Sequence, residues 1–127
     1  MSSEWTSEEL DAVGGADELQ IASVRTDGTL RPYVTIWTVR SGDDLYVRTA
    51  YGPGARWFTH AKESGIGRIR AGGIERDVTF AEPDAGLGET IDAAYEGKYG
   101  RYGKGVVKTV VGPQVHDLTI RLEPRNA

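Results

Sequence analysis

Short strand-like segments joined by tight turns are the feature that most limits the folds open to this chain. Three of the turns supply glycine where a positive φ is needed, at Asp27-Gly28-Thr29, Ser41-Gly42-Asp43 and Gly72-Gly73. The flanking segments alternate apolar and polar residues or are rich in β-branched and aromatic ones. Because tight turns join antiparallel neighbours, the pattern predicts an antiparallel sheet built from hairpins. Strands are predicted at 18–25, 31–39, 45–50, 66–71, 74–82 and 115–124.

Three segments carry helical signals instead. Thr6 and Glu9 have the spacing of a capping box, which predicts a short helix at about 7–13, ended by glycines. Two further helices are predicted at 55–63, with an amphipathic pattern, and at 85–99, with apolar residues at helical spacing.

The order of these elements favours a mainly β, α+β fold class: a six-stranded antiparallel barrel-like sheet with two or three short helices. A chain of 127 residues is long enough for one core, so we expect a single domain over 1–127.

Composition narrows the possible partners. Fifteen basic and nineteen acidic residues are interspersed and give a net charge of −4, which predicts no general affinity for nucleic acid or membranes. The chain has no cysteine and two histidines far apart, so no metal site is predicted. The N-terminus has neither a basic start nor an apolar run, and we expect a cytoplasmic protein.

The stretch TAYGPGARWF, residues 49–58, is the most suggestive functional segment. It runs from a predicted strand through a glycine turn into a helix, whose first N–H groups lack helical partners and attract anions. Arg56 adds a guanidinium that can donate hydrogen bonds to two oxygens of a phosphate at once. The alternative is that Arg56 is a solvated first-turn residue paired with Glu63.

Residues 44–80, DLYVRTAYGPGARWFTHAKESGIGRIRAGGIERDVTF, resemble the flavin- and deazaflavin-binding split β-barrels. This superfamily includes pyridoxamine phosphate oxidase and the deazaflavin-dependent nitroreductases. The tail AAYEGKYGRYGKGVVKTVVGPQVHDLTIRLEP resembles a family of small bacterial split barrels that carries only a domain-of-unknown-function label. The resemblance covers about 18–124 and leaves the N-terminal helix, within 1–15, outside it.

The resemblance implies which residues hold a cofactor. Thr49 and Arg56 take the positions that contact the cofactor phosphate, with Ala50 and Gly54 in the turn between them. The second strand would lie along the ring system, and Trp57 matches an early helix aromatic that is commonly structural. The implied cofactor-binding residues are Tyr33, Thr35, Trp37, Thr49, Ala50, Gly54, Arg56 and Trp57.

The resemblance also implies a function. The first expectation is a homodimeric oxidoreductase that binds FMN in a dimer-interface groove and exchanges hydride with a small organic substrate. The phosphate-binding signatures of the FMN and deazaflavin enzymes are both incomplete here, so three alternatives stay open. These are a reductase that uses the deazaflavin coenzyme F-420, a non-catalytic module for a flavin, heme or other planar ligand, and an interaction protein with an empty groove. No catalytic residue is assigned.

Three further features have a functional and a structural interpretation. His60 is either a proton donor or an exposed helix residue. The pair His116-Asp117 has no nucleophile near it in the sequence, so it is weak evidence for a catalytic triad. The stretch GKYGRYGKG, residues 97–105, gathers Lys98, Arg101 and Lys104, and either closes over an anionic ligand or forms a surface loop. We favour the surface loop.

Overall fold

The computed structural model describes residues 5–49 and 55–125. The helices are α1 (Ser7–Gly15), α2 (Arg56–Ser64), α3 (Gly88–Tyr99), α4 (Lys104–Val107) and α5 (Pro113–His116). The strands are β1 (Leu19–Ser23), β2 (Val34–Ile36), β3 (Thr38–Ser41), β4 (Asp44–Arg48), β5 (Ile66–Ala71), β6 (Ile74–Ala81) and β7 (Thr119–Pro124). None of the helices in these ranges is long and apolar enough to cross a membrane.

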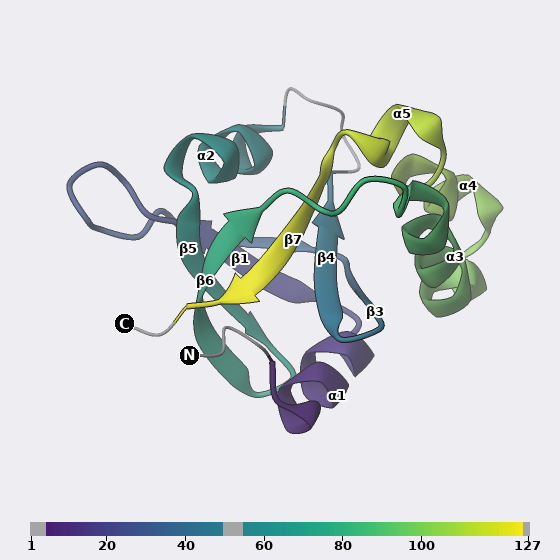
Figure 1. Cartoon of the computed structure of the whole chain (residues 1–127), viewed down its shortest axis with the longest axis horizontal. Helices are drawn as coiled ribbons and strands as arrows, with labels where there is room; N and C mark the ends of the chain where they lie inside the picture. Colours follow the sequence, from purple (N-terminus) through teal and green to yellow (C-terminus); the bar gives the residue numbers. More distant parts are fainter. Residues whose placement is uncertain (1–4, 50–54, 126–127) are drawn as a thin grey trace.

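The strands form one antiparallel sheet that curls into a nearly closed barrel (Figure 1). The strand order is β2-β1-β5-β6-β7-β4-β3, so β2 and β3 stand at opposite ends of the order although Trp37 alone separates them in the chain. The sheet must therefore bend round until its two ends nearly meet at Trp37. This confirms the predicted antiparallel barrel.

The barrel has seven strands where the sequence predicted six, because the strand expected at 31–39 is divided. Its first part, β2, pairs with β1, and its second part, β3, pairs with β4. A strand that leaves one neighbour for another must turn between the two ladders. Trp37 is the residue at that turn.

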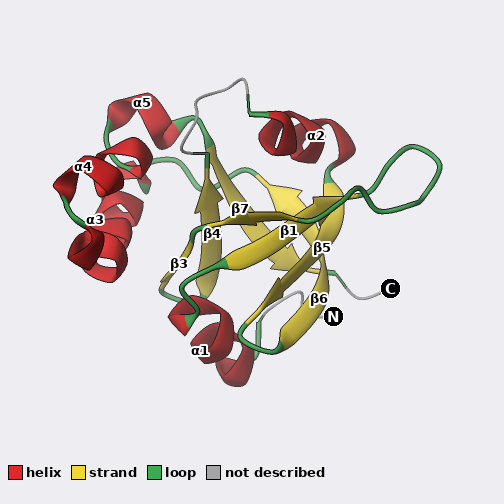
Figure 2. Cartoon of the chain, turned by 180° about the vertical axis from the view of Figure 1, so that it is seen from behind, coloured by secondary structure: helices red, strands yellow, loops and turns green. Residues whose placement is uncertain are grey.

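Helices cover different parts of the barrel, with α1 and α2 at opposite ends and α3 to α5 beside β3 and β4 (Figures 1 and 2). The predicted capping box of α1 is present: the N–H of Glu9 donates to Thr6 Oγ1 at 3.1 Å and the N–H of Thr6 donates to Glu9 Oε1 at 2.9 Å. Helix α1 continues past residue 13 to Gly15. Gly14 lies against Arg40, and a Cβ at this position would come within 2.9 Å of that side chain.

The segment predicted as a surface loop at 97–105 is instead mostly helical. Helix α3 ends at Tyr99, as predicted for the helix at 85–99, but a 3₁₀ turn then covers Gly100–Tyr102 and α4 starts at Lys104. Tyr99 is fully buried, and its ring stacks on Trp37 with centroids 4.0 Å apart. Its hydroxyl accepts from the N–H of Thr38 at 3.2 Å. These contacts hold the helical segment against the point where the barrel strand divides.

A substitution of Gly67 on β5 tests how closely the residues inside the barrel are packed. A Cβ at this position would lie 2.2 Å from the backbone oxygen of Ala22 and 2.6 Å from the Phe80 ring. We expect Gly67→Ala to lower the free energy of unfolding by about 2 kcal/mol, because strand β1 or the ring must move. Urea denaturation measures this change.

Gly97→Ala is the matched control. Gly97 lies inside α3, and no heavy atom lies within 4 Å of the place that a Cβ would take, so alanine should stabilise the protein by about 0.5–1 kcal/mol. Equal effects of the two substitutions would contradict the close approach of β1 to β5 at Gly67.

Candidate functional site

A groove of about 280 Å³ lies between β1, the start of β2 and helix α2. Its lining residues are Ile21, Ala22, Ser23, Arg31, Pro32, Val34, Arg56, Trp57, His60 and Ala61. The apolar members suit a flat organic ring, and the polar ones are concentrated on the chain before β2 and on α2. Such a mixture of apolar walls and few polar groups is typical of small-molecule sites.

The charges of the groove are one-sided. Arg31 and Arg56 both line it, and none of its described lining residues is a carboxylate. Within the described ranges neither arginine has an ion-pair partner, and the alternative pair between Arg56 and Glu63 is not formed. In this part of the chain the groove therefore presents two free guanidinium groups to a ligand.

The N-terminus of α2 adds to this preference. The N-cap residue is Ala55, which makes no side-chain hydrogen bond to the first turn, and the first turn has no acidic residue. The partial positive charge at this helix end is therefore not offset by the helix's own side chains. A phosphate or carboxylate at this end of the groove would meet the helix N-terminus and Arg56 together.

The structure brings together some of the predicted cofactor residues. Arg56 and Trp57 both line the groove, and Trp57 is half-buried with its ring edge-on to Phe58 at 5.8 Å. Thr49 is fully buried directly after β4. Ala50 and Gly54 lie outside the described residues.

The predicted residues of the second strand lie apart from this groove. The Arg70 guanidinium sits 3.7 Å from the centre of the Tyr33 ring, and Trp37 stacks on Tyr99 of α3. Thr35 is exposed on β2, and it is Val34 that lines the groove. In this chain the groove therefore gathers Arg56 and Trp57 but not Tyr33, Thr35 or Trp37.

Arg31 also lines the groove, although no sequence pattern singled it out. The segment 24–30 forms an excursion between β1 and β2, and the N–H of Arg31 donates to the Ser23 oxygen at 2.9 Å. This bond fixes Arg31 beside the end of β1. The sequence held one signal for this placement: Arg31 follows the predicted turn at Asp27-Gly28-Thr29, which puts it opposite the end of the preceding strand.

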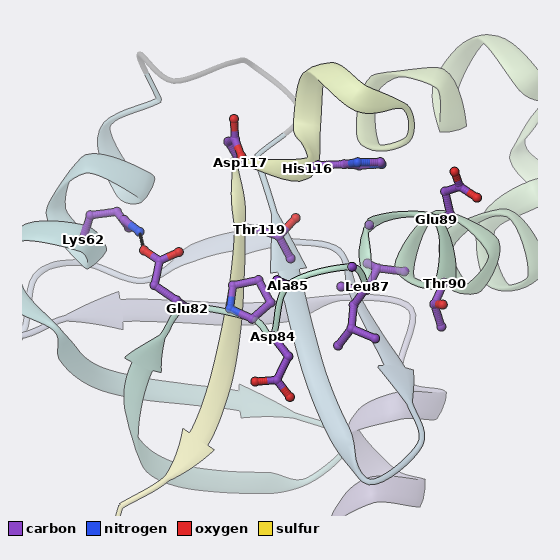
Figure 3. A pocket seen from close by; sticks show the side chains of 14 residues that line it. Lys62, Glu82, Asp84, Ala85, Leu87, Glu89, Thr90, His116, Asp117 and Thr119 are labelled. Carbon is purple, nitrogen blue, oxygen red and sulfur yellow. Dashed lines mark hydrogen bonds and ion pairs between the residues drawn. The ribbon is translucent and has the colours of Figure 1, made fainter.

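A second, larger cavity of about 750 Å³ lies on the other side of α2, between the loop after β6, the start of α3 and helix α5 (Figure 3). His116 of α5 lines it, and its Nε2 lies 3.0 Å from Asp92 Oδ2. The partner of His116 is therefore Asp92 of α3, and not the adjacent Asp117 that the sequence suggested.

Asp92 also binds Arg48, the most deeply buried charge of the described chain. Arg48 is 2% exposed, and its Nη1 donates to Asp92 Oδ1 and to the Val110 oxygen at 2.8 Å. Its Nε donates to Thr119 Oγ1 at 2.7 Å, and its Nη2 to the Gly88 oxygen at 3.1 Å. One side chain thus joins β4, α3, the segment before α5 and β7.

The ionisation of Asp92 follows from these contacts. Burial raises its pKa, but hydrogen bonds from His116 and Arg48 favour the carboxylate more strongly, so the pKa of Asp92 lies below its usual value. Asp92 is therefore an anion at neutral pH and neutralises the buried guanidinium.

The fold is shared with solved structures whose descriptions name different functions. The chain superposes on a Listeria innocua protein described as a "Putative Pyridoxamine 5'-phosphate oxidase" with a TM-score of 0.59 and 15% identity, over 87% of this chain and 85% of that one. An F420 reductase gives a TM-score of 0.56 and 14% identity, over 91% and 93%. HutZ, the heme storage protein from Vibrio cholerae, gives 0.52 and 17%, over 88% and 84%.

These similarities show that the chain shares its barrel fold with these structures. Residues 9–122 match the family model described as "Uncharacterized protein conserved in bacteria (DUF2255)", and the chain belongs to this family. No curated protein sequence matches the chain.

Asp92→Asn tests the buried ion pair. It leaves Arg48 without an anionic partner, so we expect the free energy of unfolding at pH 7 to fall by about 3 kcal/mol. Because the folded-state pKa of Asp92 is lowered, its contribution is complete above the unfolded-state value of about 4 and is lost as the pH falls through the lower folded-state value. The variant should therefore lose less stability than the parent on acidification. Urea titrations from pH 7 down to pH 3 measure both effects.

Asp11→Asn serves as the control. Asp11 pairs with Arg40 at 2.9 Å on the surface, where such a pair contributes about 0–1 kcal/mol. A parent and an Asp92→Asn variant with the same acid dependence would contradict the role given to Asp92.

Proposed function

We propose that the groove beside α2 binds the phosphate-bearing end of FMN and that the protein is a flavin-dependent oxidoreductase acting on a small organic substrate. One observation carries the proposal: in the described ranges Arg31 and Arg56 line a single groove without ion-pair partners, and no carboxylate lines it. Two free guanidinium groups in a partly apolar groove match an anionic group attached to an aromatic ring.

Each lining residue has a distinct role in this proposal. Arg56 and the N-terminus of α2 hold the phosphate, and Arg31 neutralises its second charge. Trp57 and Val34 provide apolar surface for the ligand. A bound flavin supplies the hydride chemistry, so the chain need only bind, orient and exclude water. This is consistent with a sequence in which no nucleophile with its own base was found.

The dimensions of the groove support a homodimer. About 280 Å³ lies just below the roughly 300–1,000 Å³ typical of ligand pockets, so a complete flavin would extend beyond the groove of one chain. Val34 on β2 lines the groove and is 39% exposed, so it leaves apolar surface uncovered in a single copy of the chain. A second copy packed over this strand would cover Val34 and complete the walls of the site.

The structural relatives supply two alternatives. The F420 reductase similarity favours the deazaflavin coenzyme F-420, which also carries phosphate and would use the same two arginines. The heme storage similarity favours a heme module, and His60 in the groove would then be a candidate iron ligand. Arg31 and Arg56 would pair with the propionates in that case.

Arg56→Ala tests the phosphate site. A charge-assisted hydrogen bond contributes about 1.5–3 kcal/mol, so the Kd for FMN should rise by about 10- to 160-fold. Quenching of tryptophan fluorescence and the visible spectrum of bound flavin both measure this, since Trp57 lines the groove. Arg40→Ala, at a position on β3 outside the groove, should leave the Kd unchanged.

The same titration with F-420 and heme separates the alternatives. If F-420 binds more tightly than FMN, F-420 becomes the proposed cofactor, and the proposed class of enzyme, an oxidoreductase, stays the same. A heme spectrum that His60→Ala abolishes would favour the storage or sensing module. Failure of the parent protein to bind any of the three would refute the proposal.

A further inference from the structure

Lys98, in the last turn of α3, is a half-buried amine beside the start of β3. Its Nζ donates to the Thr38 backbone oxygen at 2.7 Å and lies 5.0 Å from the centre of the Tyr99 ring. A carbonyl oxygen and a ring face both attract an ammonium, but neither carries the negative charge that would neutralise it. Within the described ranges Lys98 forms no ion pair, so it is a partly desolvated amine without a counter-ion.

Asp17, before β1, is the carboxylate whose charge acts on Lys98, but it is bound to another cation. Arg101, three residues further along the chain, donates to Asp17, and the Tyr102 hydroxyl donates to the same carboxylate at 3.3 Å. The positive charge of Arg101 also acts on Lys98 and opposes a second positive charge there. Arg101 therefore both occupies the available carboxylate and repels the ammonium form of Lys98.

These surroundings favour the neutral form of the Lys98 amine. Burial lowers its pKa most strongly, the charge of Asp17 acts in the opposite direction, and the charge of Arg101 lowers it further, so the pKa of Lys98 falls to about 8. A lysine is nucleophilic only when it is neutral, and desolvation or a neighbouring cation is the usual way in which a protein activates one. The geometry around Lys98 supplies both.

The hydrogen bond to Thr38 indicates which modification this position accepts. An amide on Nζ is neutral and retains one N–H, so it can still donate to the Thr38 oxygen. A neutral imine, formed with an aldehyde, has no N–H and would lose this bond. The product that fits a half-buried position next to a backbone oxygen is therefore an acyl-lysine.

The place of Lys98 in the fold indicates the size of the acyl donor. Lys98 lines neither the groove beside α2 nor the cavity beside α5, so a large donor has no binding site next to it there. Its neighbours Arg101 and Tyr102 are exposed, which places the end of α3 at the surface. A small donor that needs no pocket suits this position.

We propose that Lys98 is a modification site that small acyl phosphates acylate without an enzyme. The neutral Nζ attacks the carbonyl carbon of the acyl phosphate, an N–C bond forms, and the C–O bond to the phosphate breaks. Inorganic phosphate leaves with the bonding electron pair, and the surplus proton of the amine passes to water. The modified side chain loses its charge and keeps its bond to Thr38. The proposal does not depend on the flavin groove.

Site-resolved acetylation tests the proposal. The full-length protein is incubated with acetyl phosphate between pH 7 and pH 10, and peptide mass spectrometry gives the acetylation rate of each lysine. Lys108 is exposed and Lys62 is paired with Glu82, so both serve as internal controls. At pH 7.5 we expect Lys98 to react roughly tenfold faster than either control, although it is the more buried amine. Its rate should reach half of the maximum near pH 8, where an ordinary lysine needs about pH 10.4.

Arg101→Gln tests the arrangement of charges. It removes the neighbouring cation and leaves Asp17 free to pair with Lys98, so the ammonium form is favoured and the acetylation rate at pH 7.5 should fall roughly fivefold. Arg101 is exposed, so the fold should be retained. Arg68→Gln is the matched control, because it breaks another surface pair, with Asp77 at 2.8 Å on the strands β5 and β6, and should leave the rate at Lys98 unchanged.

Three outcomes would overturn the proposal. These are acetylation of Lys98 no faster than that of Lys108 at pH 7.5, a half-maximal rate at about pH 10, and an Arg101→Gln variant in which Lys98 reacts as fast as in the parent. None of them bears on FMN binding to the groove, which has its own arginines and its own assay.

Discussion

The buried guanidinium of Arg48 is the constraint on which the arrangement of the C-terminal half depends. An arginine 2% exposed cannot lose its charge, so every donor must find an acceptor inside the protein. Its partners are Asp92, Thr119 and the backbone oxygens of Gly88 and Val110, which belong to separate segments of the chain. Those segments must meet at one point for the charge to be satisfied. The start of α3, the turn before α5 and the first residue of β7 are thereby fixed relative to the end of β4.

The local parts of this fold were predictable because their causes are local. A positive-φ glycine at Gly42 or Gly72 dictates a tight turn between neighbouring strands, and the capping box of Thr6 and Glu9 dictates where α1 begins. The hairpin of β5 and β6 was therefore predicted to within a residue at each end. The class of barrel followed from the sum of such turns, helped by a resemblance that covers most of the chain.

The remaining features depend on residues far apart in sequence. The division of one predicted strand at Trp37 exists because β1 and β4, which are not neighbours in the sheet, each take half of it. The stretch 97–105 contains glycines that suggested a loop, yet the stacking of Tyr99 on Trp37 and the bond from Thr38 hold it as helix. Likewise nothing near His116 in the sequence points to Asp92, since its neighbour Asp117 is the obvious candidate. Pairings of this kind are set by the closure of the barrel and have no local signal.

The two cavities show why net charge is a poor guide to what such a protein binds. A value of −4 spread over 127 residues argues against polyanions, but it does not describe either cavity. Among the described residues, one side of α2 faces a groove with two arginines and no carboxylate, and Lys62, further along the same helix, faces a cavity with four carboxylates. Helix α2 thus separates two environments of opposite charge, each close to one of the two histidines. Electrostatics would therefore draw an anionic ligand to the arginine side of this helix before any shape-specific contact is made.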